Sequence, residues 1–248
     1  MKNLPLIALA LVLGIACSPV GQEASSSDAP PAASGELVDP AGPQQAVQPS
    51  TGSVQMNWTR TFDEDPADAP PPGFLFGRTG SGRPGQWLVR ANSGAPSGAN
   101  VLAQLDTDAT NNRYPVAVLD APSLRDVRVS VRCKAVSGKV DQACGLVARY
   151  RDENNYFVTR ANALEDNVRL YVMKNGNRRQ IASWSGKVTP NAWHTLQLEV
   201  QGDRLQVSWN GQRVIDHRDG TFADAGRVGL WTKADSVTYF DDLRADAL

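Results

Sequence analysis

The sequence has little of what marks several large protein classes. Among its 248 residues are only two histidines and three cysteines, and 25 basic against 26 acidic side chains give a net charge of −1. Because nucleic-acid binding needs a clustered basic excess, we expect no nucleic-acid partner. No apolar run reaches the roughly 18–20 residues that a membrane-spanning helix requires, which argues against an integral membrane protein. Glycine follows no collagen-like period, which excludes that class.

Motifs of common catalytic and metal sites are missing as well. We find no His-x-His, Glu-x-x-His or clustered Cys/His spacing of the kind that binds transition metals. There is no Gly-x-Ser-x-Gly nucleophile elbow. Residues 77–85 are rich in glycine, but they lack the Gly-Lys-Ser/Thr of a phosphate loop and a helix after it.

A short N-terminal signal predicts export. Residues 4–15 form an apolar run of 12 residues, which is too short to span a bilayer and typical of a secretory signal. The run leads to Ala16-Cys17, which resembles the cleavage site of a bacterial lipoprotein. We therefore expect a signal peptide at 1–16 and a lipid on Cys17 that anchors the protein to a membrane. Ser18 resembles the residue that directs lipoproteins to the outer membrane, facing the periplasm. An ordinary signal peptide is the alternative.

A tether follows the expected anchor. Between residues 18 and 53, 23 of 36 residues are Pro, Gly, Ala or Ser, and none is Lys, Arg or aromatic. A segment with so few apolar side chains cannot offset the entropy lost on ordering, so we predict a disordered linker over residues 17–53.

The remaining residues, 54–248, predict one all-β domain. Residues 127–135 alternate apolar side chains with polar or charged ones, and residues 196–200 and 205–209 do the same. This period of two is typical of strands with one buried face. We find no amphipathic helical window of useful length. The pattern therefore predicts an antiparallel sandwich or barrel.

Turn signals divide the domain. Asn-Gly pairs between strand-like runs are the strongest short hairpin signal, and two are present. The predicted turns are Ser137-Gly138, Asn175-Gly176, Gly202-Asp203 and Asn210-Gly211. Residues 63–85 are rich in Pro and Gly, and we expect them to form a loop that covers a sheet edge.

The two cysteines of the domain predict a disulfide. Cys133 and Cys144 flank the turn expected at Gly138-Lys139, so they could lie opposite each other on the paired strands of a hairpin. Cys133 shares a face with the valines of its strand, and Cys144 shares a face with Leu146 and Ala148, so both should point to the core. An exported compartment is also oxidising. A pair of buried free thiols is the alternative.

Several segments together resemble a known family. They are NYFVTRAN at 155–162, LEDNVRLY at 164–171, AWHTL at 192–196 and GLWTKADSVTYFDDL at 229–243. The pattern resembles the 3-keto-disaccharide hydrolase family, within the concanavalin A-like lectin/glucanase superfamily, over about residues 62–248. The resemblance implies an all-β, two-sheet antiparallel jelly roll with a concave face that often meets carbohydrate. It also implies that enzymatic relatives cleave oxidised glycosides, whose 3-keto group permits elimination of the aglycone.

The glutamates argue against an ordinary glucanase. Such enzymes use two carboxylates across the scissile bond, and the related glucanases carry them on one strand as Glu-x-Asp-x-x-Glu, which this sequence lacks. Only Glu165 lies within a resembling motif. Elimination at a 3-keto sugar instead needs a base and an electrophile for the enolate. Glu165 is the candidate base, with Arg160 or Lys233 as the candidate electrophile.

Polar and aromatic residues on shared strand faces predict a sugar-binding groove. Guanidinium and amide groups donate to hydroxyls, and aromatic faces stack on apolar sugar faces. The candidate ligand-binding residues are Arg149, Arg160, Asn162, Asn167, Arg169, Trp231 and Lys233. Solvent-facing strand residues without a ligand are the alternative.

These observations predict a lipid-anchored envelope protein that binds carbohydrate or a glycan-like ligand. A 3-keto-glycoside hydrolase or lyase and a non-catalytic protein-interaction module are the competing functions. Asp241 and Asp242 could supply oxygen ligands to a structural Ca²⁺, although a solvated strand end explains them better. No other cofactor is expected.

Overall fold

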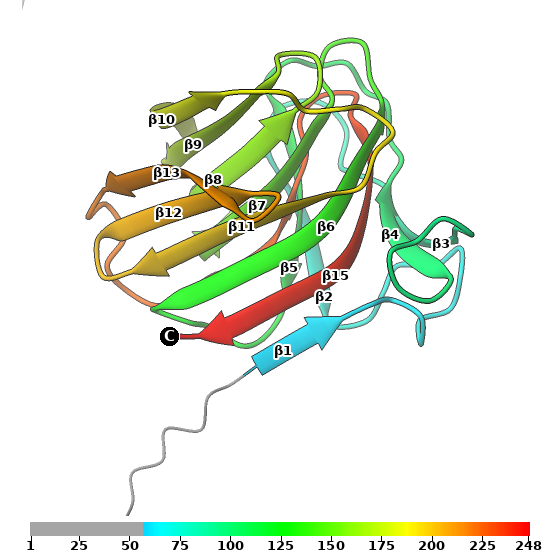
Figure 1. Cartoon of the computed structure of the whole chain (residues 1–248), viewed down its shortest axis with the longest axis horizontal. Helices are drawn as coiled ribbons and strands as arrows, with labels where there is room; N and C mark the ends of the chain where they lie inside the picture. Colours follow the sequence, from blue (N-terminus) through cyan, green and yellow to red (C-terminus); the bar gives the residue numbers. More distant parts are fainter. Residues whose placement is uncertain (1–56) are drawn as a thin grey trace, which may run out of the picture. The chain divides into compact units, whose positions relative to one another are not determined.

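Two antiparallel β-sheets packed face to face form the part of the chain that the structure describes, residues 57–248 of a computed structural model (Figure 1). These residues include no helix long and apolar enough to cross a bilayer. The all-β sandwich predicted from the sequence is confirmed. The signal, Cys17 and the tether lie outside the described residues.

Sheet A has the strand order β13-β12-β11-β6-β15-β4-β3, with β1 paired to β15. Its strands are β1 (Asn57–Arg60), β3 (Trp87–Ala91), β4 (Asn100–Gln104), β6 (Val127–Ser137), β11 (His194–Gln201), β12 (Arg204–Trp209), β13 (Gln212–Arg218) and β15 (Val237–Ala247).

Sheet B has the order β10-β9-β8-β7-β14-β5-β2. Its strands are β2 (Phe74–Gly80), β5 (Arg113–Leu119), β7 (Ala143–Asp152), β8 (Asn155–Asn162), β9 (Asn167–Lys174), β10 (Asn177–Ser185) and β14 (Arg227–Trp231).

Three of the predicted hairpins are confirmed, and they set the register of both sheets. Antiparallel pairs β9–β10, β11–β12 and β12–β13 join at the three expected turns. At Asn175-Gly176 and at Asn210-Gly211 both residues have positive φ, which is what a tight two-residue hairpin turn requires.

Two sequence predictions about local structure are wrong. No hairpin forms at Ser137-Gly138, because β6 belongs to sheet A and β7 to sheet B, so the chain crosses between the sheets there. The segment 63–85 is not all loop, since it contains β2, the edge strand of sheet B. Pro and Gly in its flanks masked a strand whose seven residues all pair with β5.

The main core lies between the sheets and is cross-linked by a disulfide. Val129 and Val131 of β6 face Leu146 and Leu170 of sheet B in one continuous buried cluster. Cys133 and Cys144 form the predicted disulfide with 6.3 Å between their Cα atoms. The bond joins sheet A to sheet B, not two paired strands of one hairpin as expected.

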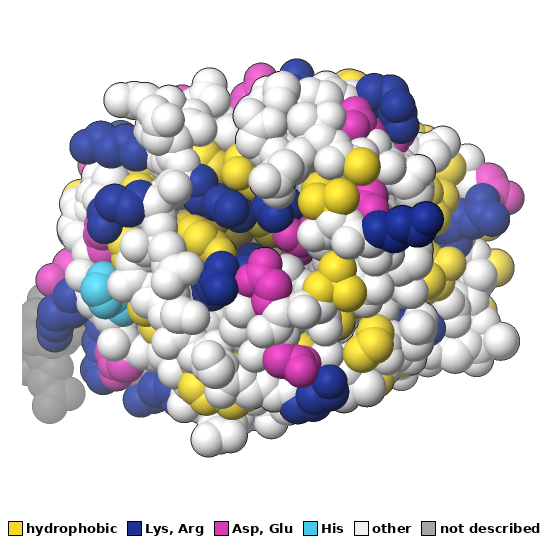
Figure 2. All heavy atoms as spheres, turned by 90° about the horizontal axis from the view of Figure 1, so that it is seen from above, with side chains coloured by type: hydrophobic (Ala, Val, Ile, Leu, Met, Phe, Trp, Pro, Cys, Tyr) yellow, Lys and Arg dark blue, Asp and Glu magenta, His cyan; other side chains and the backbone are white. Residues whose placement is uncertain are grey.

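The central strands of sheet B are buried on both faces, and this positions the candidate site. In β8, Phe157 and Ala161 belong to the core between the sheets, whereas Tyr156 and Val158 belong to a second buried cluster on the outer face. The sheet curves strongly: Arg178 of the edge strand β10 reaches across the intervening strands to Tyr114 of β5. The outer face of sheet B is therefore concave, and Figure 2 shows a hollow in the surface with apolar and basic side chains inside it.

Candidate functional site

Five aromatic side chains form the floor of the concave face. Tyr114 and Trp231 stack with their centroids 5.5 Å apart, and Tyr150 and Tyr156 stack at 5.4 Å. Tyr171 lies on the same face. We call Tyr114, Tyr150, Tyr156, Tyr171 and Trp231 the aromatic floor, and the hollow above it the sheet-B groove. All five side chains are buried, so in this structure they pack mainly against one another and against the side chains above them.

A glycine lets Trp231 lie close to the sheet. Gly145 of β7 pairs with Trp231 on one side and with Arg160 on the other. A Cβ at Gly145 would come within 3.0 Å of Trp231 Cε3 and 2.9 Å of the Thr159 carbonyl oxygen. The missing side chain therefore leaves the space that the indole ring occupies.

Arg160 is the buried cation at the centre of the groove. Only 1% of its surface is exposed. Its Nη2 donates to Glu165 Oε2 at 2.9 Å and to the Tyr171 hydroxyl at 3.2 Å, and its Nη1 donates to Asn167 Oδ1. Its buried Nε has no acceptor within the described part of the chain.

Glu165 is held as an ionised counter-charge. Its Oε2 also accepts from Asn167 Nδ2 at 3.1 Å and lies 3.1 Å from Arg169 Nη1. Burial by itself would raise the pKa of Glu165, but the hydrogen bond from Asn167 and the Arg160 guanidinium hold that pKa below its usual value. Glu165 is consequently a poor general acid, and its carboxylate is shared between two guanidinium groups.

Lys233 and Asn162 belong to a second buried polar group beside the first. Lys233 Nζ lies 2.5 Å from Asp141 Oδ2, and Asn162 Nδ2 donates to Asp141 Oδ1 at 2.8 Å. Asp141 is fully buried, and this burial raises the pKa of its carboxyl although Lys233 acts in the opposite direction. Sequence analysis missed Asp141 because it lies in the β6–β7 crossover, outside any alternating run.

The structure therefore brings most of the predicted site residues together. Arg160, Asn162, Asn167, Arg169, Trp231, Lys233 and Glu165 all lie in or beside the sheet-B groove. Their functional roles stay predictions, since these residues bind one another and other protein groups in the structure.

Arg149 does not join them. A register shift in β7 follows Ala148, and Arg149 has a φ of 49°. Its guanidinium donates to the backbone carbonyls of Arg125 and Phe222 and to Asp126. The prediction that Arg149 binds the ligand is thus not supported, because the irregular backbone breaks the alternation on which it rested and commits the side chain to structural contacts.

Arg178 is the principal groove residue that sequence analysis missed. Its Cζ lies 4.7 Å from the Tyr114 centroid, 4.6 Å from that of Tyr171 and 5.9 Å from that of Trp231. The guanidinium covers the aromatic floor through cation–π contacts. The Asn175-Gly176 turn could have revealed it, because the hairpin register pairs Arg178 with Met173, two residues from Tyr171 on the same face.

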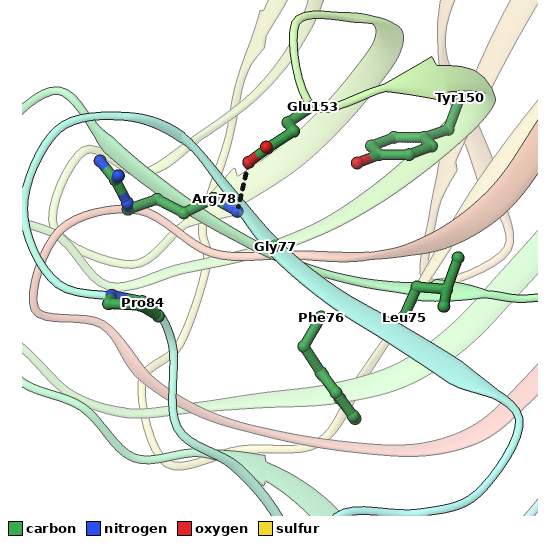
Figure 3. Close-up of a pocket in the computed structure, with 7 residues that line it drawn as sticks. All are labelled: Leu75, Phe76, Gly77, Arg78, Pro84, Tyr150 and Glu153. Carbon is green, nitrogen blue, oxygen red and sulfur yellow. Dashed lines mark hydrogen bonds between the residues drawn. The ribbon is translucent and has the colours of Figure 1, made fainter.

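A separate cavity of about 330 Å³ lies at the β2 end of sheet B (Figure 3). Tyr150 of the aromatic floor and Glu153 lie on the same side of β2, and Glu153 Oε2 accepts from the Arg78 backbone N–H at 3.2 Å. Burial, reinforced by the charge of Glu153, raises the pKa of Tyr150 to about 12. The exposed side chains of Leu75 and Phe76 supply an apolar rim.

Asp241 and Asp242 do not fit a calcium site as they are arranged. Calcium takes six to eight oxygen ligands. Both oxygens of Asp241 already accept hydrogen bonds from Ser97, and one also accepts from the Asp242 backbone N–H. Among residues 57–248 no group of three or more His, Cys, Asp or Glu side chains is placed to hold a metal ion.

Two antiparallel sheets packed face to face, one of them curved with aromatic and polar side chains on its concave outer face, are typical of concanavalin A-like jelly rolls. More particularly, the model of the 3-keto-alpha-glucoside-1,2-lyase-like domain matches residues 97–245, so the chain belongs to this family. The resemblance inferred from the sequence is confirmed. No curated protein matches the chain.

Solved structures support the same fold. The carbohydrate-binding module CBM66 from Bacillus subtilis matches with a TM-score of 0.56 and 20% identity, over 69% of this chain and 94% of its own. Lectin II from Ulex europaeus matches with a TM-score of 0.54 and 10% identity, over 78% of this chain and 99% of its own. The exoplasmic/lumenal domain of VIP36, in a form bound to Ca²⁺ and Man3GlcNAc, matches with a TM-score of 0.52 and 12% identity. The match covers 71% of this chain and 84% of that domain. At these identities the likeness is one of fold alone.

Proposed function

We propose that the sheet-B groove binds carbohydrate. The observation that carries the proposal is the aromatic floor beneath Arg178, with Arg160 and Arg169 beside it, because apolar rings and directional N–H donors together match the two kinds of surface that a sugar offers. Structural neighbours with this fold include a carbohydrate-binding module and a lectin, which supports the same class of ligand.

Binding to a glycan panel tests the proposal. We expect the full mature chain to bind at least one oligosaccharide, with quenching or a shift of tryptophan fluorescence because Trp231 lies in the floor. Trp231→Leu should abolish binding, whereas Trp58→Leu, a substitution at sheet A, should leave it unchanged. Failure of every oligosaccharide to bind, or capture of an envelope protein without any sugar binding, would overturn the proposal.

The family match favours cleavage of 3-keto-glycosides as a second candidate function. In such an elimination a base takes the proton next to the 3-keto carbon, and the electron pair forms an enolate. The enolate returns to the ketone as a C1=C2 double bond forms and the bond from the anomeric carbon to the aglycone breaks. The aglycone oxygen takes up the proton that the base returns. In this candidate function the ionised Glu165 would accept the proton, and Arg160, which pairs with it, would stabilise negative charge on the enolate oxygen. Release of aglycone from a 3-keto-glucoside, lost in Glu165→Gln, would establish it. No release, with or without divalent metal, would dispose of it.

We also propose that the protein is anchored at the bacterial outer membrane through lipid on Cys17, facing the periplasm. The support is the apolar run at 4–15 followed by Ala16-Cys17. Cells fed a labelled fatty acid should incorporate label into the wild-type protein, and Cys17→Ser should release an unlabelled, soluble form. Label in the Cys17→Ser protein would contradict the proposal.

A further inference from the structure

The sheet-B groove holds more positive charge than its own carboxylates balance. Asp141 is paired with Lys233, and Glu165 serves both Arg160 and Arg169. Arg178 forms no salt bridge with any residue of the described domain. Its charge is met only by the π faces of the aromatic floor.

The same groove holds a surplus of N–H donors. Of the buried nitrogens that have no acceptor in residues 57–248, three belong to groove arginines: Arg160 Nε, Arg169 Nε and Arg178 Nη1. Arg160 is 1% exposed, whereas Arg169 and Arg178 are only partly buried, so the guanidinium groups of Arg169 and Arg178 are the ones that a ligand can reach. An unsatisfied buried donor costs free energy that a ligand acceptor recovers.

The cationic groups lie close enough to act on one ligand group. Glu165 Oε2 lies within 3.1 Å of nitrogens from both Arg160 and Arg169. The guanidinium groups of Arg160 and Arg178 both contact the Tyr171 ring, at 5.9 and 4.6 Å from its centroid. Arg178 is only partly buried and covers rings that are fully or nearly buried, so a ligand entering the groove meets Arg178 first.

We infer that the ligand of the sheet-B groove is an acidic sugar, whose carboxylate accepts hydrogen bonds from the guanidinium groups of Arg160, Arg169 and Arg178. The inference rests on the proposed carbohydrate-binding function and names its ligand class. Guanidinium groups match a planar carboxylate with paired N–H donors, and these charge-assisted bonds are stronger than bonds to neutral hydroxyls. The aromatic floor lies beneath Arg178 and holds its guanidinium through cation–π contacts, which limits the positions that the group can take toward the carboxylate.

Matched pairs of oligosaccharides test the inference by calorimetry. The probes are oligomers of galacturonate, glucuronate, mannuronate and guluronate, each beside its neutral methyl ester. We expect at least one acid to bind tenfold or more tightly than its ester, and that ratio to fall as salt screens the charges. If an ester or another neutral sugar binds and every acid binds equally or more weakly, the inference fails and carbohydrate binding stands. If nothing binds, both fail.

Variants of strand β10 test whether Arg178 produces the preference for the acid over its ester. Arg178→Met should remove most of the preference for the acid, and Arg178→Lys, which keeps the charge but not the paired donors, should restore part of it. Arg179→Met is the matched control, because Arg179 is exposed, faces away from the groove and pairs with Asp219. An acid preference that survives Arg178→Met, or that Arg179→Met removes equally, would overturn the assignment. Far-UV circular dichroism confirms folding, since Arg178 lies on an edge strand.

Discussion

Cys133 of β6 and Cys144 of β7 join the two sheets of the sandwich through a disulfide. The bond lies in the core between the sheets, next to the crossover that brings Asp141 to the groove. Cross-linking across a sequence separation of 11 residues stabilises the fold by about 2–3 kcal/mol in the chain-entropy model.

We therefore expect Cys133→Ala with Cys144→Ala to lower the free energy of unfolding by about 2–3 kcal/mol. Urea denaturation of the wild-type protein with and without a reductant supplies the comparison, and the reductant should have no effect on the double variant. Equal stability of reduced and oxidised wild-type protein would contradict the prediction.

Gly145→Ala should disturb the groove without unfolding the domain. The new Cβ would lie 2.9 Å from the Thr159 carbonyl oxygen and 3.0 Å from Trp231 Cε3, closer than van der Waals contact. Overpacking of this kind lowers stability by about 1–3 kcal/mol. Displacement of the indole should also weaken sugar binding and change tryptophan fluorescence. Gly220→Ala is the control, because nothing lies within 4 Å of a Cβ there. If Gly145→Ala and Gly220→Ala changed stability, sugar binding and fluorescence to a similar extent, the close contact at Gly145 would not be the cause.

Asp235 anchors the crossover that carries Asp141. Its carboxylate accepts backbone N–H bonds from Lys139 at 2.6 Å and from Val140 and Asp141 at 3.0 Å. Asp235→Ala should lower stability by about 2–4 kcal/mol, since it leaves these donors without their charged acceptor. Chemical denaturation at neutral pH measures the loss, and a loss well under 1 kcal/mol would show that water replaces the carboxylate.

The pH dependence of Asp235 has a definite sign. Burial by itself would raise its pKa, but the three backbone N–H groups hold that pKa below the ordinary 3.8. An acid with a lowered folded-state pKa stabilises the fold above its unfolded-state pKa, and that contribution disappears as pH falls through the folded-state value. The gap in stability between wild type and Asp235→Asn should therefore be full at neutral pH and shrink below pH 3.8. A gap that is constant over this range would contradict it.

Calcium removal should leave the domain unchanged. Asp241 is engaged by Ser97 and by the Asp242 backbone, and its burial raises the pKa of its carboxyl, which disfavours the charge that calcium needs. We expect the same melting temperature in calcium and in a chelator. A rise in melting temperature with calcium, abolished by Asp242→Asn, would show that the two carboxylates rearrange to bind the ion.

The strands could be predicted from the sequence where one face is buried and the other is exposed to solvent. Over residues 127–135 of β6 each apolar side chain is buried and each polar one is partly exposed, so the alternation in the sequence matched the structure. The Asn-Gly hairpins were predictable because their backbone requires positive φ at both positions. Strand β8 gave a weaker signal, since both of its faces are buried and its Arg160 and Asn162 look like solvent-facing residues.

The sequence by itself determined the all-β class, the family, the disulfide partners and most of the residues that line the groove. These follow from local patterns, which need no knowledge of which strands pair. Only the tertiary structure decided that the disulfide joins two sheets, that Arg149 turns away and that Arg178 reaches Tyr114 across the curved sheet. Curvature and sheet membership depend on contacts between residues far apart in the chain, and the periodicity of a single strand carries no record of them.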